Sequence, residues 1–134
     1  MKVTFGGYVI GSNEARNKLP LVINPSSEEI SKRVFAVSGG VGVLAMRPDP
    51  APEFGPLELT LYAEGGRFLL LLTEISEDGE CNVRTLTNED AASDFVSILG
   101  EMYPAKAVTS NSILVCSVFV EFSKVGDVSS GLMN

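Results

Sequence analysis

The 134-residue sequence contains no histidine and no tryptophan, and it has only two cysteines. Without histidine, Ser-His-Asp catalysis, Cys-His catalysis and histidine-based metal sites are all excluded, and two thiols are too few for a zinc cage. The chemistry that remains is that of carboxylates, lysine, tyrosine and a lone cysteine. We therefore expect no catalytic residue, no bound metal and no cofactor, and we interpret the chain as a non-enzyme.

Basic residues are scarce as well. Ten Lys and Arg stand against 17 Asp and Glu, which gives a formal net charge of −7. Such a chain repels phosphate backbones, so the composition argues against nucleic-acid binding. The longest apolar run, FLLLL at residues 68–72, is far shorter than the roughly 18 residues that span a bilayer. Since no signal peptide is evident either, we expect a cytoplasmic protein that does not associate with membranes.

With 45% hydrophobic and 20% charged residues, the composition is that of a globular protein. We expect a single domain over residues 1–134, with a loosely held tail from about residue 124. Cys81 and Cys116 each lie among strand-forming residues, so we expect two buried thiols. A disulfide between them stays open as an alternative, because nothing marks an oxidising compartment.

The clearest helix signal lies at residues 26–40. Ser26 and Glu29 have the spacing of a capping box, and an apolar stripe at helical spacing follows. The stripe consists of Ile30, Val34 and Val37. Gly39 and Gly40 then stand where a left-handed C-cap is expected. Because a phosphate-binding loop places its glycines before a helix and these follow one, we interpret the SGGVG stretch as a helix exit.

The other segments complete the predicted fold. We expect an edge strand with a bulge at residues 2–11, a strand at 41–46, and a meander of strands at 57–63, 67–75 and 81–87. We expect a second helix over residues 87–102 and a last strand at 113–122. The order is β-α-β-β-β-β-α-β. It predicts the α+β class, with one mostly antiparallel sheet of five or six strands and both helices packed on one face.

The densest cluster of charge surrounds the predicted turn at Asp78-Gly79, where Glu74, Glu77 and Glu80 lie close in sequence. Its alternatives are a solvated turn, a protein-binding edge or a hard-cation site. Arg67 and Arg84 are expected to pair across the meander with Glu58 or Glu74. A candidate partner-binding surface then combines the turn with the polar side of strand 57–63. Its residues are Glu58, Tyr62, Glu74, Glu77, Asp78 and Glu80.

Four blocks of the sequence carry a family resemblance, at residues 24–46, 55–90, 91–108 and 119–128. Their layout of capped helix, glycine exit, meander and LGEMYP segment resembles that of the small immunity proteins of bacterial polymorphic-toxin and contact-dependent growth-inhibition systems. The resemblance implies stoichiometric binding to a cognate toxin domain, often a basic nuclease, through an acidic surface. No site motif of that family matches this sequence residue by residue, so the resemblance assigns no individual binding residue.

Two other functions are compatible with the same residues. One is a structural or regulatory domain whose open sheet face forms a homodimer, so that the expected state is a monomer or a homodimer. The other is a small enzyme that uses carboxylates alone or with a divalent cation. A toxin-binding protein is the first of the three hypotheses, ahead of the homodimer and the enzyme.

Overall fold

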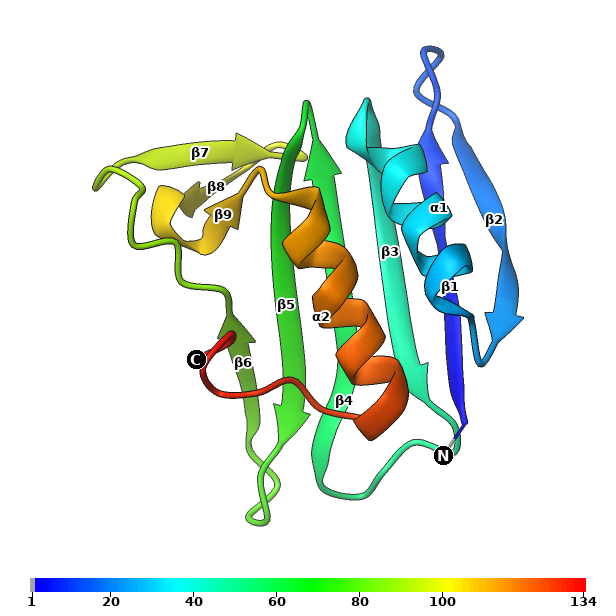
Figure 1. The fold of residues 1–134 in the computed structure, drawn as a ribbon. Helices are drawn as coiled ribbons and strands as arrows, with labels where there is room; N and C mark the ends of the chain where they lie inside the picture. The colour runs from blue at the N-terminus through cyan, green and yellow to red at the C-terminus, as the bar shows by residue number, and fades with distance from the viewer. Residues whose placement is uncertain (1) are drawn as a thin grey trace.

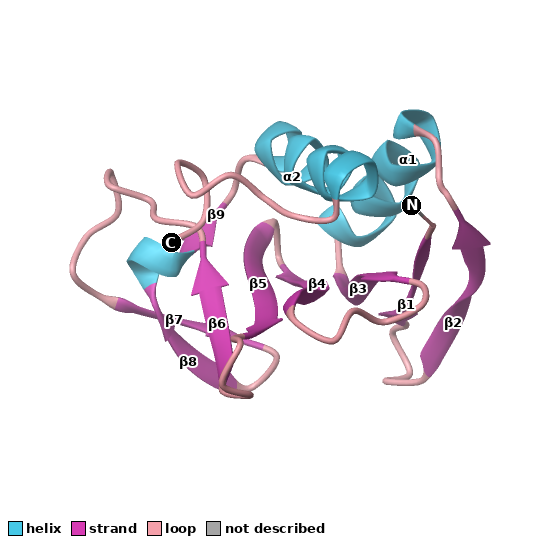
Figure 2. Cartoon of the chain, turned by 90° about the horizontal axis from the view of Figure 1, so that it is seen from below, coloured by secondary structure: helices cyan, strands magenta, loops and turns pink. Residues whose placement is uncertain are grey.

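The computed structural model describes residues 2–134. Six strands form one antiparallel sheet in the order β2-β1-β3-β4-β5-β6, and the short strand β9 pairs with β5 (Figure 1). Both helices, α1 and α2, lie on the same face of this sheet (Figure 2). The predicted α+β class and the mostly antiparallel sheet under two helices are therefore confirmed.

The bounds of the elements follow the chain from the N-terminus. They are Val3–Ile10 (β1), Arg16–Ile23 (β2), Ser27–Ser38 (α1), Val41–Pro48 (β3), Gly55–Glu64 (β4), Arg67–Ile75 (β5), Cys81–Thr85 (β6), Phe95–Ile98 (β7), Glu101–Pro104 (β8), Val108–Thr109 (β9) and Ser112–Val125 (α2). A 3-10 turn at Ala105–Ala107 precedes β9. The chain thus opens with a hairpin and its last long element is a helix, which differs from the predicted order of elements.

Strand β1 lies inside the sheet and not at its edge. It pairs with β2 on one side and with β3 on the other. The predicted bulge is present, because the register with β2 shifts between Phe5 and Gly7. The edge belongs to β2, which tolerates Pro20 since an edge strand can lack one backbone donor.

Helix α1 begins as the sequence predicts. Ser26 Oγ accepts from the Glu29 N–H at 3.1 Å, and the Glu29 carboxylate accepts from the Ser26 N–H at 3.0 Å. The helix ends at Gly39, whose φ of −94° is not left-handed, so the predicted left-handed cap is wrong. A close approach of α1 to β3 accounts for the glycine at position 42, because a Cβ there would lie 2.6 Å from Val37 Cγ1.

The predicted meander of three antiparallel strands is confirmed as β4, β5 and β6. Leu59, Leu61 and Ala63 of β4 are fully buried beneath the helices, and Glu58 and Tyr62 lie on the opposite face. Strand β5 is apolar on both faces in its middle, because Leu70 and Leu72 pack under the helices and Leu69 packs against residues of β7 on the other face. The β5–β6 connection is a tight turn at residues 76–80.

The segment predicted as the last strand is helix α2. Asn111 caps it by accepting from the Leu114 N–H at 3.1 Å, and Gly126 ends it with a φ of 71°. Its buried residues fall at helical spacing and are Val115, Val118, Phe119 and Phe122. The prediction followed the strand propensity of the β-branched residues, but the period of burial decides. The Phe119 ring packs on Phe5 of β1 with centroids 5.3 Å apart.

The segment predicted as the second helix is a loop followed by the hairpin β7–β8. Leu99 and Gly100 both have positive φ, 52° and 85°, and they connect the paired residues Ile98 and Glu101. Two such residues make the tight turn that a hairpin needs and that a helix cannot contain. The hairpin rests on the open face of the sheet, where Ile98 packs with Leu69 in a second small core.

The C-terminal segment is held in place, which corrects the expectation of a loose tail. Val128 and Met133 are buried. The backbone of Asn134 exchanges two hydrogen bonds with Thr85, at 3.0 and 3.2 Å. Residues 126–134 therefore cross from the end of α2 to the outer edge of β6 (Figure 1).

The two cysteines also differ from expectation. Cys81 is exposed at the start of β6, Cys116 is half-buried on α2, and both are free thiols. The expected burial was wrong because Cys81 lies on an edge strand and Cys116 lies on the flank of a helix. Within residues 2–134, no helix combines the length and the apolar character needed to cross a membrane.

Candidate functional site: an acidic flank beside β6

Charge is divided unequally along the chain. Residues 1–47, the basic half, contain six Lys and Arg and three Asp and Glu, a formal charge of +3. Residues 48–134, the acidic half, contain four Lys and Arg and fourteen Asp and Glu, a formal charge of −10. In the fold the basic half forms β1, β2, β3 and α1, and the acidic half forms the opposite side of the sheet (Figure 1).

The turn between β5 and β6 concentrates exposed carboxylates. Its backbone is closed by the Ser76 N–H donating to the Glu80 carbonyl and by the Gly79 N–H donating to the Ser76 carbonyl, both at 2.9 Å. Gly79 has a φ of 85°, which suits glycine. Glu77 and Glu80 extend into solvent from this fixed turn.

Asp78 holds the same turn from within. Its carboxylate accepts from the Ser76 hydroxyl and from the Glu80 N–H. These two hydrogen bonds, first that of Ser76, lower the pKa of Asp78 below its ordinary value. Asp78 is therefore charged and immobilised, so the turn presents its carboxylates in a defined arrangement.

A second group of carboxylates lies at the other end of β6. Glu89, Asp90 and Asp94 are exposed on the loop that leads to the hairpin β7–β8. Glu89 and Asp90 fall at the start of the segment that was predicted as a helix over residues 87–102. In the structure they stand on a loop. We name the six exposed carboxylates at the two ends of β6 the acidic flank: Glu77, Asp78, Glu80, Glu89, Asp90 and Asp94.

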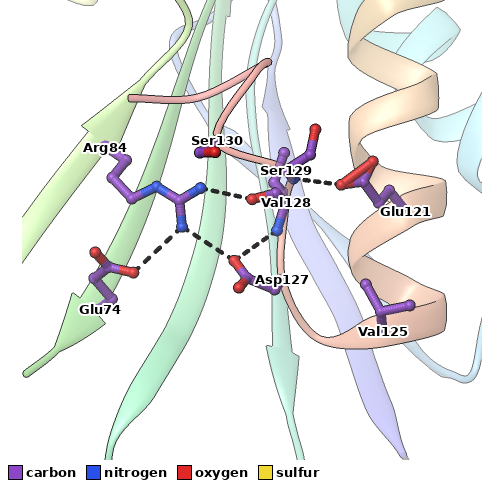
Figure 3. A pocket seen from close by; sticks show the side chains of 8 residues that line it. All are labelled: Glu74, Arg84, Glu121, Val125, Asp127, Val128, Ser129 and Ser130. Carbon is purple, nitrogen blue, oxygen red and sulfur yellow. Dashed lines mark hydrogen bonds and ion pairs between the residues drawn. The ribbon is translucent and has the colours of Figure 1, made fainter.

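Between the two ends of the flank, Arg84 fixes the C-terminal segment (Figure 3). Its guanidinium donates to the Val128 carbonyl at 2.6 Å and to the Met133 carbonyl at 3.1 Å. It also pairs with Glu74 at 3.3 Å and with Asp127 at 3.0 Å, and its side chain is only 16% exposed. The predicted pairing of Arg84 with Glu74 is thus present, and Glu74 is committed to it.

A cavity of about 450 Å³ lies beside Arg84, and Glu121 lines its α2 side (Figure 3). The Glu121 carboxylate accepts from the Ser129 N–H, so this group also serves to position the C-terminal segment. Within residues 2–134, no three His, Cys, Asp or Glu side chains are grouped in a way that suits a metal ion. The hydrogen-bonding groups around Arg84 are satisfied by one another, so we interpret the cluster as structural. We call it the Arg84 clamp, because it holds the C-terminal segment against β6.

The remaining two predicted residues lie elsewhere. Glu58 is on the open face, where it binds Arg47 and accepts from the Thr60 hydroxyl at 2.7 Å. Tyr62 lies on the same face, where it packs with Tyr103 against the second small core that contains Leu69 and Ile98. Burial, and after it the neighbouring Tyr103 and Glu58, raise the pKa of Tyr62, so its phenol stays neutral at physiological pH.

The six predicted residues are therefore spread over three places. The turn brings Glu77, Asp78 and Glu80 together, Glu74 lies on the helix-covered face, and Glu58 and Tyr62 lie on the open face. Sequence reasoning missed the carboxylates of the 88–94 loop as a surface and Asp127 as a partner of Arg84. The excess of acids after residue 47 was the available signal for the loop.

The structure defines the class of this protein as a two-layer α+β domain, with a twisted antiparallel sheet beneath two helices. A family model with the description "Family of unknown function (DUF6911)" matches residues 2–132, and the chain belongs to that family. It is similar to the crystal structure of a hypothetical protein from Neisseria gonorrhoeae, with a TM-score of 0.83 and 34% sequence identity. The match covers 96% of this chain and 91% of that one. Comparison with curated proteins gives no match.

Proposed function

We propose that the protein is an immunity protein, which binds a cognate toxin domain of basic charge and blocks it without catalysis. The observation that carries this proposal is the acidic flank, in which six exposed carboxylates lie at the two ends of one strand, in a half of net charge −10. A surface of this kind attracts a basic protein over long range and accelerates its association.

The anatomy of the flank supports binding to a protein. Exposed apolar side chains accompany the carboxylates, with Val83 on β6 54% exposed and Phe95 on β7 62% exposed. Apolar anchors with a charged surround are typical of protein interfaces, in which the anchor contributes most of the affinity. The clamp at Arg84 keeps the C-terminal segment ordered beside this surface. The protein would act in the cytoplasm, where a nuclease toxin reaches its substrate.

The test needs the cognate toxin domain. If a large secreted protein is encoded beside this gene, its C-terminal domain, in a catalytically inactive form, is the partner to test. Titration calorimetry at about 50 and about 300 mM salt should show a clear loss of affinity at high salt, because screening weakens exposed charge pairs. The double substitution Glu77→Lys with Glu80→Lys should weaken binding by about tenfold or more at low salt.

The matched control is Glu14→Lys with Glu28→Lys, which reverses two exposed acids in the basic half. It changes the net charge by the same amount and should leave the affinity close to that of the wild type. An affinity that is independent of salt, or an equal loss in both double variants, would overturn the role of the flank. Absence of any complex with the neighbouring toxin domain would overturn the function.

A further inference from the structure

A second charged surface lies on strand β2, at the edge of the sheet opposite to β6. The open face of this strand carries two bases followed by two apolar side chains, and all four are exposed. They are Arg16, Lys18, Leu21 and Ile23. Leu21 is 65% exposed and Ile23 is 55% exposed. We name these four residues the β2 face.

The two bases lie on the open face, and no carboxylate of the protein neutralises them. Lys18 pairs with Tyr8, which shares the open face with Tyr62 in the register of β1, β3 and β4. The Arg16 guanidinium packs over the Tyr8 ring, 4.7 Å from its centroid. Among the described residues, 2–134, neither base takes part in an ion pair. Both charges are therefore available to a partner.

The apolar part of the β2 face lies further along the same strand. Ile23 pairs with Thr4, and the Leu21 side chain lies over Gly6, where an added Cβ would be 3.1 Å from Leu21 Cδ1. From Lys18 to Leu21 the strand advances about 10 Å. Two bases thus stand next to two exposed apolar side chains. Apolar contacts beside charged ones are typical of protein-binding surfaces.

The acidic flank does not cancel this positive surface. Five steps of about 4.8 Å from strand to strand place β2 about 24 Å from β6. This distance is about three times the Debye length of about 8 Å at physiological ionic strength, so solvent ions screen the flank at β2. The β2 face is therefore positive, although the net charge of the chain is −7.

The backbone edge of β2 is closed to an added strand at its centre. Pro20 lacks an N–H, and its carbonyl accepts from the Arg33 side chain of α1 at 2.6 Å. At this position the edge offers no free donor, and its acceptor is already engaged. A partner therefore has to contact the side chains of the β2 face.

The shape of the open face favours a narrow partner. The hairpin β7–β8 stands on the same face, away from the helices (Figure 2), and exposes the acids Asp94 and Glu101. A flat anionic surface such as a lipid membrane would meet these carboxylates as it approached β2, and like charges repel. A second copy with its β2 face opposed would bring four bases together. A single acidic segment avoids both conflicts.

We propose that the β2 face binds an acidic segment of another protein, in which carboxylates stand next to apolar side chains. The carboxylates contact Arg16 and Lys18, and the apolar side chains pack on Leu21 and Ile23. Strands β1 and β2 have eight residues each, so the contact spans about 27 Å by 10 Å. Since this area is smaller than that of a standard interface, we expect a Kd of about 0.1 mM.

The probe is the synthetic peptide EEDEGLVVL, whose acidic block adjoins an apolar block. Its control is the uncharged counterpart QQNQGLVVL. Each is added to the isotope-labelled full chain at about 50 mM salt, where screening is weak, while amide chemical shifts are followed. The acidic peptide should perturb β2 along the β2 face. The uncharged peptide should bind at least about tenfold more weakly, because it lacks the charges that Arg16 and Lys18 attract.

The bases are tested with a matched pair of double variants. Arg16→Glu with Lys18→Glu should weaken binding of the acidic peptide by at least about tenfold. Arg67→Glu with Lys124→Glu is the control, because it reverses two other exposed bases and changes the net charge by the same amount. This control should bind as the wild type does. Circular dichroism confirms that each variant is folded.

The apolar part is tested with a second matched pair. Leu21→Ser should weaken binding by about fivefold, because the peptide loses an apolar contact. Val125→Ser on α2 is the control, since both side chains are 65% exposed in the free protein. It should leave the affinity unchanged. Equal losses in the two serine variants would contradict the placement of the contact on β2.

The absence of binding at about 2 mM acidic peptide overturns the proposal. Equal binding of the two peptides, or equal losses in both charge variants, also overturns it. Binding to phosphatidylglycerol vesicles, or self-association of the wild type, would assign the face to another occupant if Arg16→Glu with Lys18→Glu abolished it, and the proposal would then fail. The proposed toxin binding is scored separately, because Glu77 and Glu80 lie beside the opposite edge of the sheet.

Discussion

The two halves of the chain share one core but differ in what they present to solvent. The basic half contributes Phe5, and the acidic half contributes Phe119, which packs against it. Outside the core, residues 1–47 carry a charge of +3 and residues 48–134 a charge of −10. The two halves thus share buried apolar residues in one core but carry surface charge of opposite sign. The difference teaches that a net charge of −7 describes neither side of this molecule.

The largest effect should come from breaking the contact that joins the halves. Phe119→Ala removes a fully buried ring that packs on Phe5. We expect a loss of about 3–5 kcal/mol in the free energy of unfolding, measured by urea denaturation. Phe35→Ala is the control, because that ring is 81% exposed. Similar losses in the two variants would contradict the burial of α2 against β1.

A smaller loss should follow from releasing the clamp in the acidic half. Arg84→Ala leaves Glu74 and Asp127 without their cation, and the carbonyls of Val128 and Met133 without a donor. We expect about 2–4 kcal/mol less stability and faster amide exchange at Asn134. Arg67→Ala, at an exposed arginine of β5, should change stability by less than about 0.5 kcal/mol. Unchanged exchange at Asn134 would contradict the clamp.

In the basic half, the close approach of α1 to β3 can be tested with a matched pair of glycines. A Cβ at Gly42 meets Val37 Cγ1 at 2.6 Å and the Tyr8 carbonyl oxygen at 2.9 Å, whereas a Cβ at Gly39 meets nothing within 4 Å. Gly42→Ala should therefore cost about 1–3 kcal/mol in thermal or urea unfolding. Gly39→Ala should be close to neutral. Equal stabilities would show that α1 does not lie against Gly42.

The smallest effect concerns the acidic turn. The pKa of Asp78 is lowered in the folded state, so its charged form stabilises the fold above the ordinary Asp pKa of about 4. This contribution is lost as the pH falls through the folded pKa. Asp78→Asn should be slightly less stable than the wild type at pH 7, and the difference should vanish in more acid solution. A difference that grows on acidification would reverse the assignment.

The sequence predicts the elements whose signals are local. Helix α1 has its cap and stripe within a dozen residues, and the β5–β6 turn has its Asp78-Gly79 dipeptide. Helix α2 was predicted as a strand because its β-branched and aromatic residues favour strands, although its buried residues recur at helical spacing. The hairpin β7–β8 was missed because its turn depends on Leu99, which is unusual at a positive φ.

The candidate site was predictable only in its local part. Glu77, Asp78 and Glu80 lie together because one tight turn holds them. The partners of Arg84 are 43 to 49 residues away along the chain, apart from Glu74, and no periodicity reveals contacts at that separation. Glu58 pairs with Thr73 of the adjacent strand, so Glu74, the next residue of β5, lies on the opposite face because successive side chains of a strand alternate.

The most direct test of the account is a map of the surface that the toxin domain contacts. Amide chemical shifts of the isotope-labelled protein would be followed while the inactive toxin domain is added. The account predicts perturbation of Glu77, Glu80 and the 88–94 loop, with little change along β2 and α1. Perturbation confined to β2 and α1 would contradict it.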